Sequence, residues 1–233
     1  MKTLVSLLLV GGLVLSCAGL PTLHPTEGPV PLEVNLPCLG IYPTGKWQLL
    51  HAIEAELPGN HTGFLMGLTR FSSQERSARC VIMTLEGFVL FDARYDGQIK
   101  IERAVAPFDN EAFAQGVMAD IRLIFFKPLA DKTTTGTLAD GAPVCRHRLA
   151  DGKVIDVVQG ESNLWEMRLY SSNHRLKRIV KSRLKERPST EDPSGIADKI
   201  ELTAQGTPGY KLVLDLVEAI PLKPTGSAVQ RSD

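Results

Sequence analysis

Few side chains in this sequence have the types and spacing that catalysis or metal binding requires. None of the patterns G-x-S-x-G, H-E-x-x-H, C-x-x-C or a P-loop occurs in the 233 residues. His51 falls on the apolar face of a predicted strand, so packing is the favoured interpretation and a functional role the alternative. His147 stands between Arg146 and Arg148, two cations that oppose a metal ion, and is expected at the surface. We expect no catalytic residue, no metal site and no cofactor, and keep a hydrolase as a third alternative.

Asp92 and Asp96 are the remaining candidates for acid–base chemistry, as a pair of carboxylates. Both lie near the dipeptide Asp96-Gly97, which is a strong signal for a two-residue hairpin turn. Aspartate side chains stabilise turns by bonding to the nearby backbone. We therefore favour a structural role in the turn for both carboxylates.

The clearest chemical signal lies near the N-terminus, where an apolar run ends in a cysteine. Lys2 precedes an apolar stretch from Leu4 to Leu15, which is too short for a membrane anchor and is typical of an export signal. The V-L-S-C that follows resembles a bacterial lipobox, in which the cysteine thiol, here that of Cys17, is diacylated and the cysteine becomes the new N-terminus. An ordinary secretory signal is the alternative. Acyl chains contribute about 0.8 kcal/mol per buried CH₂ and would anchor the protein firmly.

The other cysteines and the residue after Cys17 bear on the compartment. Resemblance to enterobacterial lipoproteins implies that a residue other than aspartate, here Ala18, allows sorting to the outer membrane. Cys38, Cys80 and Cys145 have no metal-ligand spacing, and in an oxidising compartment we expect at most one disulfide among them. Cys80 lies within an apolar strand and is interpreted as a plain buried residue.

A basic run follows residue 174, with apolar residues interleaved so that one face of a strand is charged. The favoured interpretation is a solvated strand whose charges discourage edge-to-edge pairing. A patch that contacts lipid phosphates or an acidic partner at a membrane surface is the alternative. The formal net charge of the chain is zero, which gives no reason to expect a nucleic-acid partner. The basic residues are Arg175, Lys177, Arg178, Lys181, Arg183, Lys185 and Arg187.

The elements that must position these side chains are mostly short strands, rich in Val, Ile, Phe and Leu and separated by turn residues. We predict about eleven strands between residues 46 and 220, with hairpins at Asp96-Gly97 and Asp151-Gly152. From Phe64 to Leu85 both strand faces are apolar, so another element should cover the sheet. Residues 129–143, rich in Thr, Gly and Asp, are predicted to form a mobile surface loop.

One amphipathic helix is predicted between Asp109, as N-cap, and Pro128. At about 17 residues it is near the lower length limit for a membrane span, and Asp120 and Arg122 argue against one. The helix should lie across the sheet, either as a lid over a pocket or as ordinary core. Its inward stripe is predicted to be Phe113, Val117, Ile121, Ile124 and Phe125.

The chain divides into four parts. Residues 1–16 form the signal peptide, and residues 17–45 form the lipidated cysteine and a tether with six prolines between positions 21 and 43. Residues 46–220 form one β-rich domain, and residues 221–233 a polar, disordered tail. A single antiparallel sheet of this size should curl strongly or close on itself.

Several of these features together resemble the LolA/LolB superfamily over residues 46–220, in particular the uncharacterised outer-membrane lipoproteins of aryl-polyene-type biosynthetic clusters. They are the lipobox, the proline-rich tether, the strand number and the stretches E-G-F-V-L-F-D-A-R-Y-D-G-Q-I, A-D-I-R-L-I-F-F-K-P and G-Y-K-L-V-L-D-L. The resemblance implies a mainly β fold, an unclosed half β-barrel with a helical lid, whose hydrophobic cavity carries acyl chains.

We therefore expect a lipid-anchored protein on the periplasmic face of the outer membrane that binds or transfers a lipid-like, acyl or aryl-polyene, molecule. Its partners would be the membrane and this ligand, and further candidates are a periplasmic carrier or an inner-membrane exporter. The alternative is a non-enzymatic scaffold or docking lipoprotein of an envelope export or assembly complex, with a solid core. Alternation along the strands and the helix predicts the cavity residues as Trp47, Leu49, Ile53, Phe91, Ile99, Ile101, Phe113, Val117, Ile121, Phe125, Trp165, Met167, Leu169, Leu212 and Leu214.

Overall fold

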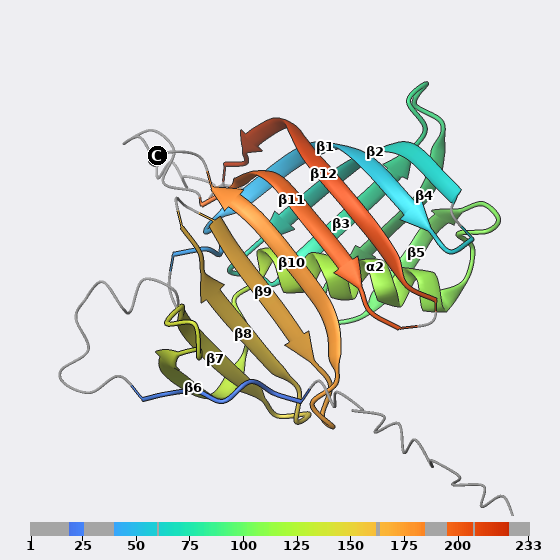
Figure 1. Ribbon diagram of the computed structural model, residues 1–233. Helices are drawn as coiled ribbons and strands as arrows, with labels where there is room; N and C mark the ends of the chain where they lie inside the picture. Colours follow the sequence, from blue (N-terminus) through green and yellow to red (C-terminus); the bar gives the residue numbers. More distant parts are fainter. Residues whose placement is uncertain are drawn as a thin grey trace, which may run out of the picture.

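The computed structural model describes residues 19–25, 40–59, 61–161, 164–184, 195–206 and 208–223. Twelve strands form one curved antiparallel sheet, and one helix of the described chain lies on its concave face (Figure 1). The predicted fold class, a mainly β chain with an unclosed sheet and a helix, is confirmed. The elements are β1 (Lys46–Leu57), β2 (His61–Ser72), β3 (Ser77–Met83), β4 (Val89–Tyr95), β5 (Ile99–Ala104), α2 (Glu111–Phe125), β6 (Ala130–Thr137), β7 (Pro143–Leu149), β8 (Val154–Gln159), β9 (Leu164–Tyr170), β10 (Leu176–Leu184), β11 (Ala197–Ala204) and β12 (Tyr210–Pro221).

The strand order is β5-β4-β3-β2-β1-β12-β11-β10-β9-β8-β7-β6, so the sheet consists of two meanders joined where β12 returns to pair with β1. In that central pairing Ile53 lies opposite Leu214 on one side and opposite Leu65 on the other. The two edge strands, β5 and β6, are consecutive strands in the sequence and are connected through α2. The helix therefore crosses the concave face from one sheet edge to the other (Figure 1).

The helix begins one residue later than predicted. Its N-cap is Asn110, not Asp109, and the Asn110 side chain accepts a hydrogen bond from the backbone N–H of Phe113 at 2.8 Å. The same amide donates to the carbonyl oxygen of Pro107 at 2.9 Å. An aspartate cannot donate this second bond, which explains why asparagine takes the cap position. The helix ends at Phe125, three residues before Pro128.

The buried face of α2 is rotated relative to the predicted stripe. Ile121, Ile124 and Phe125 are buried as expected, whereas Phe113 and Val117 are only partly buried. The fully buried positions in the first half of the helix are instead Ala114 and Met118. Stacking of Phe125 on Phe71, with centroids 5.0 Å apart, fixes the C-terminal half of the helix against β2.

The two apolar faces of β2 and β3 have different surroundings. Thr69 and Phe71 are buried on the concave face beneath the helix, which confirms that another element covers this side. On the opposite face Leu50, Leu68 and Val81 lie side by side across three strands and are half-buried. The helix thus covers only one of the two apolar faces.

The prediction of a loop over residues 129–143 is wrong, because most of this stretch forms edge strand β6. Threonine has a high preference for strands, and Thr133 and Thr135 pair with His147 and Cys145 of β7. The turn is confined to residues 138–142. The edge of β6 is extended by His24, which exchanges two backbone hydrogen bonds of 2.9 and 3.0 Å with Thr137.

Residues 19–25, which the sequence analysis assigned to the tether, lie along the outer face of β7 and β8. Leu23 packs against a small cluster formed by Leu138, Val144 and Val158. Further along the chain, Ile41 and Tyr42 are buried in the main core. Parts of the proline-rich stretch are therefore integral to the domain.

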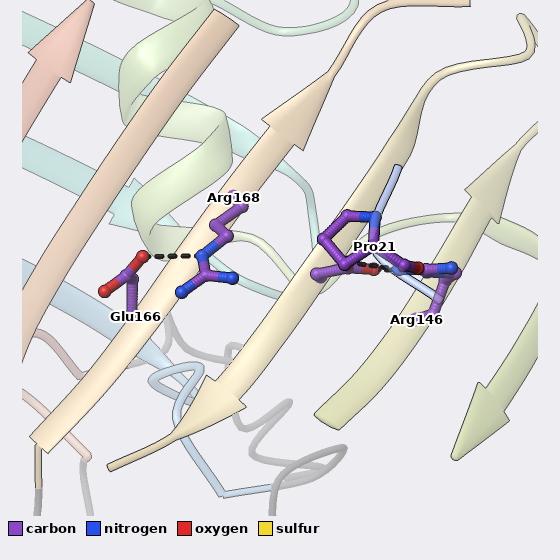
Figure 2. A network of polar contacts seen from close by, with 5 residues as sticks. Pro21, Arg146, Glu166 and Arg168 are labelled. Carbon is purple, nitrogen blue, oxygen red and sulfur yellow. Dashed lines mark hydrogen bonds and ion pairs between the residues drawn. The ribbon is translucent and has the colours of Figure 1, made fainter. Parts of the chain in front are cut away.

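The same segment covers a buried ion pair. Arg146 of β7 and Asp156 of β8 form two hydrogen bonds of 2.7 and 2.6 Å, and both side chains are almost completely buried. The carbonyl oxygen of Pro21 accepts a third bond from Arg146 at 2.8 Å (Figure 2). On the neighbouring strand Arg168 and Glu166 form a more exposed pair at 2.6 Å (Figure 2). Arg146 thereby links the N-terminal segment to the sheet.

We predict that Asp156→Ala destabilises the protein by about 3–5 kcal/mol, because it leaves the Arg146 guanidinium buried without its counter-charge. The matched control is Asp92→Ala, which breaks a bidentate pair with the half-exposed Arg79 and should cost at most about 1 kcal/mol. Urea denaturation of both variants measures the difference. Equal losses would show that the Arg146–Asp156 pair is not effectively desolvated.

Candidate functional site

A cleft runs between α2, mainly its N-terminal half, and the β4–β5 hairpin. Its volume is about 490 Å³, within the range of about 300–1,000 Å³ that is usual for small-molecule sites. The cleft opens to solvent at the β5 edge of the sheet. Its lining residues are Tyr95, Gly97, Gln98, Ile99, Ile101, Glu111, Ala114, Gln115 and Arg122.

The cleft has an apolar wall and a polar rim. Ile99 and Ile101 alternate onto the same face of β5, opposite Tyr95 and Ala93 of β4. Ile101 is 37% exposed although it is a large apolar residue at an otherwise polar edge. On the helix Gln115 donates to Glu111 at 2.8 Å, which holds both polar side chains at the rim.

A cationic side chain lies at one end of the cleft. The guanidinium of Arg122 lies over the ring of Tyr95, 4.8 Å from its centroid. Burial, together with the nearby charge of Arg122, lowers the pKa of Arg76 in the β2–β3 turn. Arg76 itself is not a lining residue of the cleft and donates to the carbonyl oxygen of Lys127 at 2.9 Å. A second, smaller cleft of about 280 Å³ lies on the other side of Tyr95 and includes Lys46, Arg70 and Arg79.

The opposite flank of the helix is fastened to the sheet by a buried polar cluster. The Asp120 carboxylate accepts hydrogen bonds from Arg178 of β10, at 2.9 Å, and from the hydroxyl of Tyr210 of β12. The Arg178 guanidinium also lies over the Tyr210 ring, 5.3 Å from its centroid. Burial raises the pKa of Asp120, while Arg178 and Tyr210 oppose this by stabilising its charged form. Sequence analysis missed this cluster, although a carboxylate beside the apolar helix stripe was a visible signal.

Most of the predicted cavity residues lie in the core. Ile99 and Ile101 are the two that line the large cleft, and Ile53 is half-buried. Partly buried residues that pack against the core are Trp47, Phe113, Val117, Leu169, Leu212 and Leu214. Fully buried core residues are Leu49, Phe91, Ile121, Phe125, Trp165 and Met167. The concave face is thus largely filled, and the larger of the two clefts described above lies at the β5 edge.

His51 packs as predicted, whereas the surface position predicted for His147 is wrong. His51 is 2% exposed, and its ring centroid lies 6.5 Å from that of Phe125. His147 is also buried, because Arg146 and Arg148 point to the other face of β7. Its Nδ1 lies 2.9 Å from the Thr133 hydroxyl. Burial and the charge of Lys127 lower the pKa of His147. Within the described ranges no cluster of three or more His, Cys, Asp or Glu could hold a metal ion.

The basic run forms β10, which lies inside the sheet between β9 and β11. The interpretation of this run as a solvated edge strand is therefore wrong. Lys181 faces Glu166 on one neighbouring strand and Glu201 on the other. These acidic residues balance the charged face. The sequence could not reveal this because the acidic residues belong to other strands.

Asp92 does not have the predicted turn role. It lies within β4 and accepts two hydrogen bonds from Arg79 of β3, at 2.9 and 2.6 Å. Asp96 lies in the turn, as expected, four residues further along the chain. The two carboxylates therefore do not form a catalytic pair.

The cysteines agree with the expected pattern where they are described. Cys80 is free and buried, and burial raises the pKa of its thiol to about 12. Cys145 is in a disulfide. Cys17 and Cys38 lie outside the described residues.

Sequence analysis also missed a set of exposed apolar side chains. Leu85 and Phe88, in the turn between β3 and β4, are 63% and 52% exposed. Phe64, at the start of the neighbouring strand β2, is 62% exposed. Gly87, which lies between Leu85 and Phe88 in the sequence, adopts a positive φ of 89° that permits the tight turn. Exposed apolar groups of this kind are typical of interaction sites.

Comparison with known proteins identifies the fold. No protein-family model and no curated protein sequence matches the chain. Among solved structures, a LolA superfamily protein from Nitrosomonas europaea aligns with a TM-score of 0.52 and 13% identity, over 85% of this chain and 96% of that one. A putative outer membrane lipoprotein-sorting protein domain from Vibrio parahaemolyticus aligns with a TM-score of 0.46 and 10% identity, over 84% and 92%. The likeness to the Nitrosomonas protein shows a shared LolA-like fold. The link to aryl-polyene clusters stays a prediction.

The described part of the chain contains no helix that is both long and apolar enough to cross a membrane.

We predict that His51 makes the protein sensitive to acid. Burial lowers the pKa of His51 from 6.5 to about 4. The unfolded chain therefore binds a proton as the pH falls through 6.5, whereas the folded chain resists protonation down to about pH 4. Stability should be full above pH 6.5 and should fall by about 3 kcal/mol towards pH 4. Urea denaturation should show this slope reduced in His51→Leu and unchanged in His61→Gln, which alters an exposed histidine. Equal slopes of the unfolding free energy against pH in the wild type and both variants would contradict this role of His51.

Proposed function

We propose that this protein is a lipid-anchored component of the outer membrane, facing the periplasm, that binds or passes on a lipid-like molecule. The observation that carries the proposal is the cleft of about 490 Å³ between α2 and the β4–β5 hairpin of an unclosed sheet. The shared fold with a LolA superfamily protein supports the same class of function. The apolar run before Cys17 supports the anchor.

The cleft suits an amphiphile with an anionic head. An acyl or polyene chain would lie against Ile99 and Ile101, because these side chains form the apolar wall. A carboxylate or phosphate head would bind the Arg122 guanidinium, whose planar donors match such groups. The Tyr95 ring already orients this guanidinium from one side.

The packing of α2 indicates how a longer chain would be admitted. Its C-terminal half is held by Phe125 against Phe71, and its far flank by Asp120 and Arg178. Its N-terminal half is packed less completely, since Phe113 and Val117 are only partly buried. We propose that the N-terminal half moves away from β5 to enlarge the cleft, with the fastened flank as the pivot.

A scaffold with a solid core is the second candidate. It is favoured by the full burial of Met118 and by the stacking of Phe125 on Phe71, which make the helix a part of the core. In that case the protein would act by docking, for example to a periplasmic carrier or an inner-membrane exporter. Uptake of a ligand by the cleft separates the two functions.

We predict that the protein binds a fluorescent fatty acid and that two substitutions at the cleft weaken binding differently. Ile101→Asp should reduce affinity at least tenfold for both the fatty acid and the matching fatty alcohol, because it places a charge on the apolar wall. Arg122→Gln should reduce affinity roughly 10- to 100-fold for the acid alone, since a hydrogen bond to a charged group contributes about 1.5–3 kcal/mol.

The matched control for this titration is Val217→Asp, which places the same charge at a 58% exposed residue that is not part of the cleft lining. It should bind both probes as the wild type does. Thermal unfolding of each variant checks that the fold is intact. A wild type that binds neither probe would refute the carrier function and leave the scaffold.

We predict that Cys17→Ser abolishes incorporation of labelled palmitate and membrane fractionation, because the serine hydroxyl cannot form the thioether to the diacylglycerol. Cys80→Ala, at the free cysteine, is the control and should retain both. The measurement is palmitate labelling of cells followed by separation of their membranes. A Cys17→Ser protein that still carries lipid in the outer membrane would show that the lipobox interpretation is wrong.

A further inference from the structure

The N-terminal segment, residues 19–25, is bound to the domain only a few residues after the proposed lipid anchor. Leu23 packs on Val144 and Val158, and the Pro21 carbonyl accepts a bond from the buried Arg146. Gly136 leaves room for this contact, since a Cβ there would lie 2.6 Å from the carbonyl oxygen of His24. The segment therefore binds to a defined position on the sheet, unlike a free tether.

The direction of this segment shows where the chain leaves the domain. His24 pairs with Thr137, which lies opposite Pro143 at the start of β7. Pro21 contacts Arg146 in the middle of β7. Followed backwards, residues 24 to 21 thus run along β7 towards its end at Leu149. The end of the described segment at residue 19 thus lies on the side of the β7–β8 turn (Figure 1).

The distance from this exit to the anchor is short. One residue, Ala18, separates Gly19 from Cys17. An extended chain spans at most about 3.6 Å per residue step, or about 7 Å for these two steps. If the whole stretch from Cys17 to Lys46 were free, the tether could reach roughly 100 Å by the same measure. Docking of residues 19–25 therefore brings this end of the sheet close to whatever surface holds Cys17.

This end of the sheet carries an excess of positive charge. Lys132, Arg148, Val154, Tyr170 and Leu176 are neighbours in one continuous row across β6 to β10. The β7–β8 and β9–β10 turns touch, since a Cβ on Gly152 would lie 3.2 Å from Ser172. We call the exposed cations of this region the basic corner, namely Lys132, Arg148, Lys153, Arg175 and Lys177.

The acidic and apolar groups of the same region fit this pattern. The exposed carboxylates nearby are Asp131 and Asp151, and Asp151 is already paired with Lys153 at 2.6 Å. Leu129, directly before β6, is 71% exposed. Cations around an exposed leucine are the combination that binds the interface of an anionic bilayer.

We propose that the basic corner rests on the anionic phospholipid surface, with residues 19–25 as a rigid strap that sets the orientation of the domain. The inference rests on the proposed anchor at Cys17. The membrane is thereby placed at the β6–β10 end of the sheet. The cleft at β5, the other edge of the sheet, stays accessible from the periplasm.

The test is lysine acetylation of the full lipidated protein in vesicles of phosphatidylethanolamine and phosphatidylglycerol, read by mass spectrometry. Lys132, Lys153 and Lys177 should react at least fivefold more slowly than in Leu23→Asp in the same vesicles, because this substitution releases the strap and leaves the anchor. For Lys100, Lys199 and Lys211, the acetylation rate of each residue should differ less than twofold between the wild type and Leu23→Asp. Gly136→Val, which displaces the His24 backbone, is a second way to release the strap if Leu23→Asp fails to fold.

The outcomes separate this inference from the function on which it rests. Protein that fails to associate with the vesicles would overturn both the anchor and the orientation. Vesicle-bound protein whose lysines react equally in wild type and strap variants would overturn the orientation alone. Slower reaction of Lys100, Lys199 or Lys211 instead would place another face on the membrane and overturn it as well. Fatty-acid binding does not depend on any of these results.

Discussion

The packing of one helix against the concave face of the sheet is the constraint on which the rest of this structure depends. A strongly curved antiparallel sheet with an apolar inner face must be covered, and α2 supplies the cover in the described chain. Because α2 connects the two edge strands, its path across the sheet is fixed at both ends. The aromatic contacts at its C-terminal half and the Asp120–Arg178–Tyr210 cluster on its flank then set its rotation. The position of the cleft follows, since it lies where α2 meets β5, a short edge strand with several polar residues.

For the proposed carrier function, this arrangement is a compromise between a stable core and space for a ligand. A helix buried evenly along its length would stabilise the sheet more, but it would leave nothing for a ligand to occupy. Here Ile121 and Phe125 are buried, whereas Phe113 and Val117 are only partly so. The polar cluster at Asp120 adds a directional contact that an apolar residue could not provide, at the cost of desolvating a carboxylate. The ring stacking and the polar cluster therefore lie in the C-terminal half of the helix, and the cleft lies mainly along the N-terminal half, reaching Arg122 at its end.

Local sequence pattern predicted which stretches form strands and the helix better than it predicted which strands pair with each other. Alternation in β1 and β4, the Asp-Gly turns and the helical spacing of Ile121 and Phe125 are properties of short stretches and were read correctly. The strand order, the interior place of β10 and the burial of His147 depend on pairing between distant residues, which periodicity does not contain. β6 was missed because threonine suits both loops and edge strands, and only its pairing with β7 decides between them. At the candidate site Ile99 and Ile101 could be predicted from alternation, but Arg122 and Tyr95 could not, since they meet across the fold.

The two edges of the sheet have different surroundings, and this difference relates the proposed anchor to the cleft. At the β6 edge His24 extends the sheet, and Leu23 covers the outer face beside it. At the β5 edge the exposed Ile101 lines an open cleft. If the two edges were alike, either edge of the sheet could face the membrane. The strap removes this ambiguity, because a short chain cannot reach from β7 to the far edge. In the proposed orientation a ligand would therefore enter from the periplasmic side, which suits delivery by a soluble carrier better than extraction from the membrane that holds the anchor.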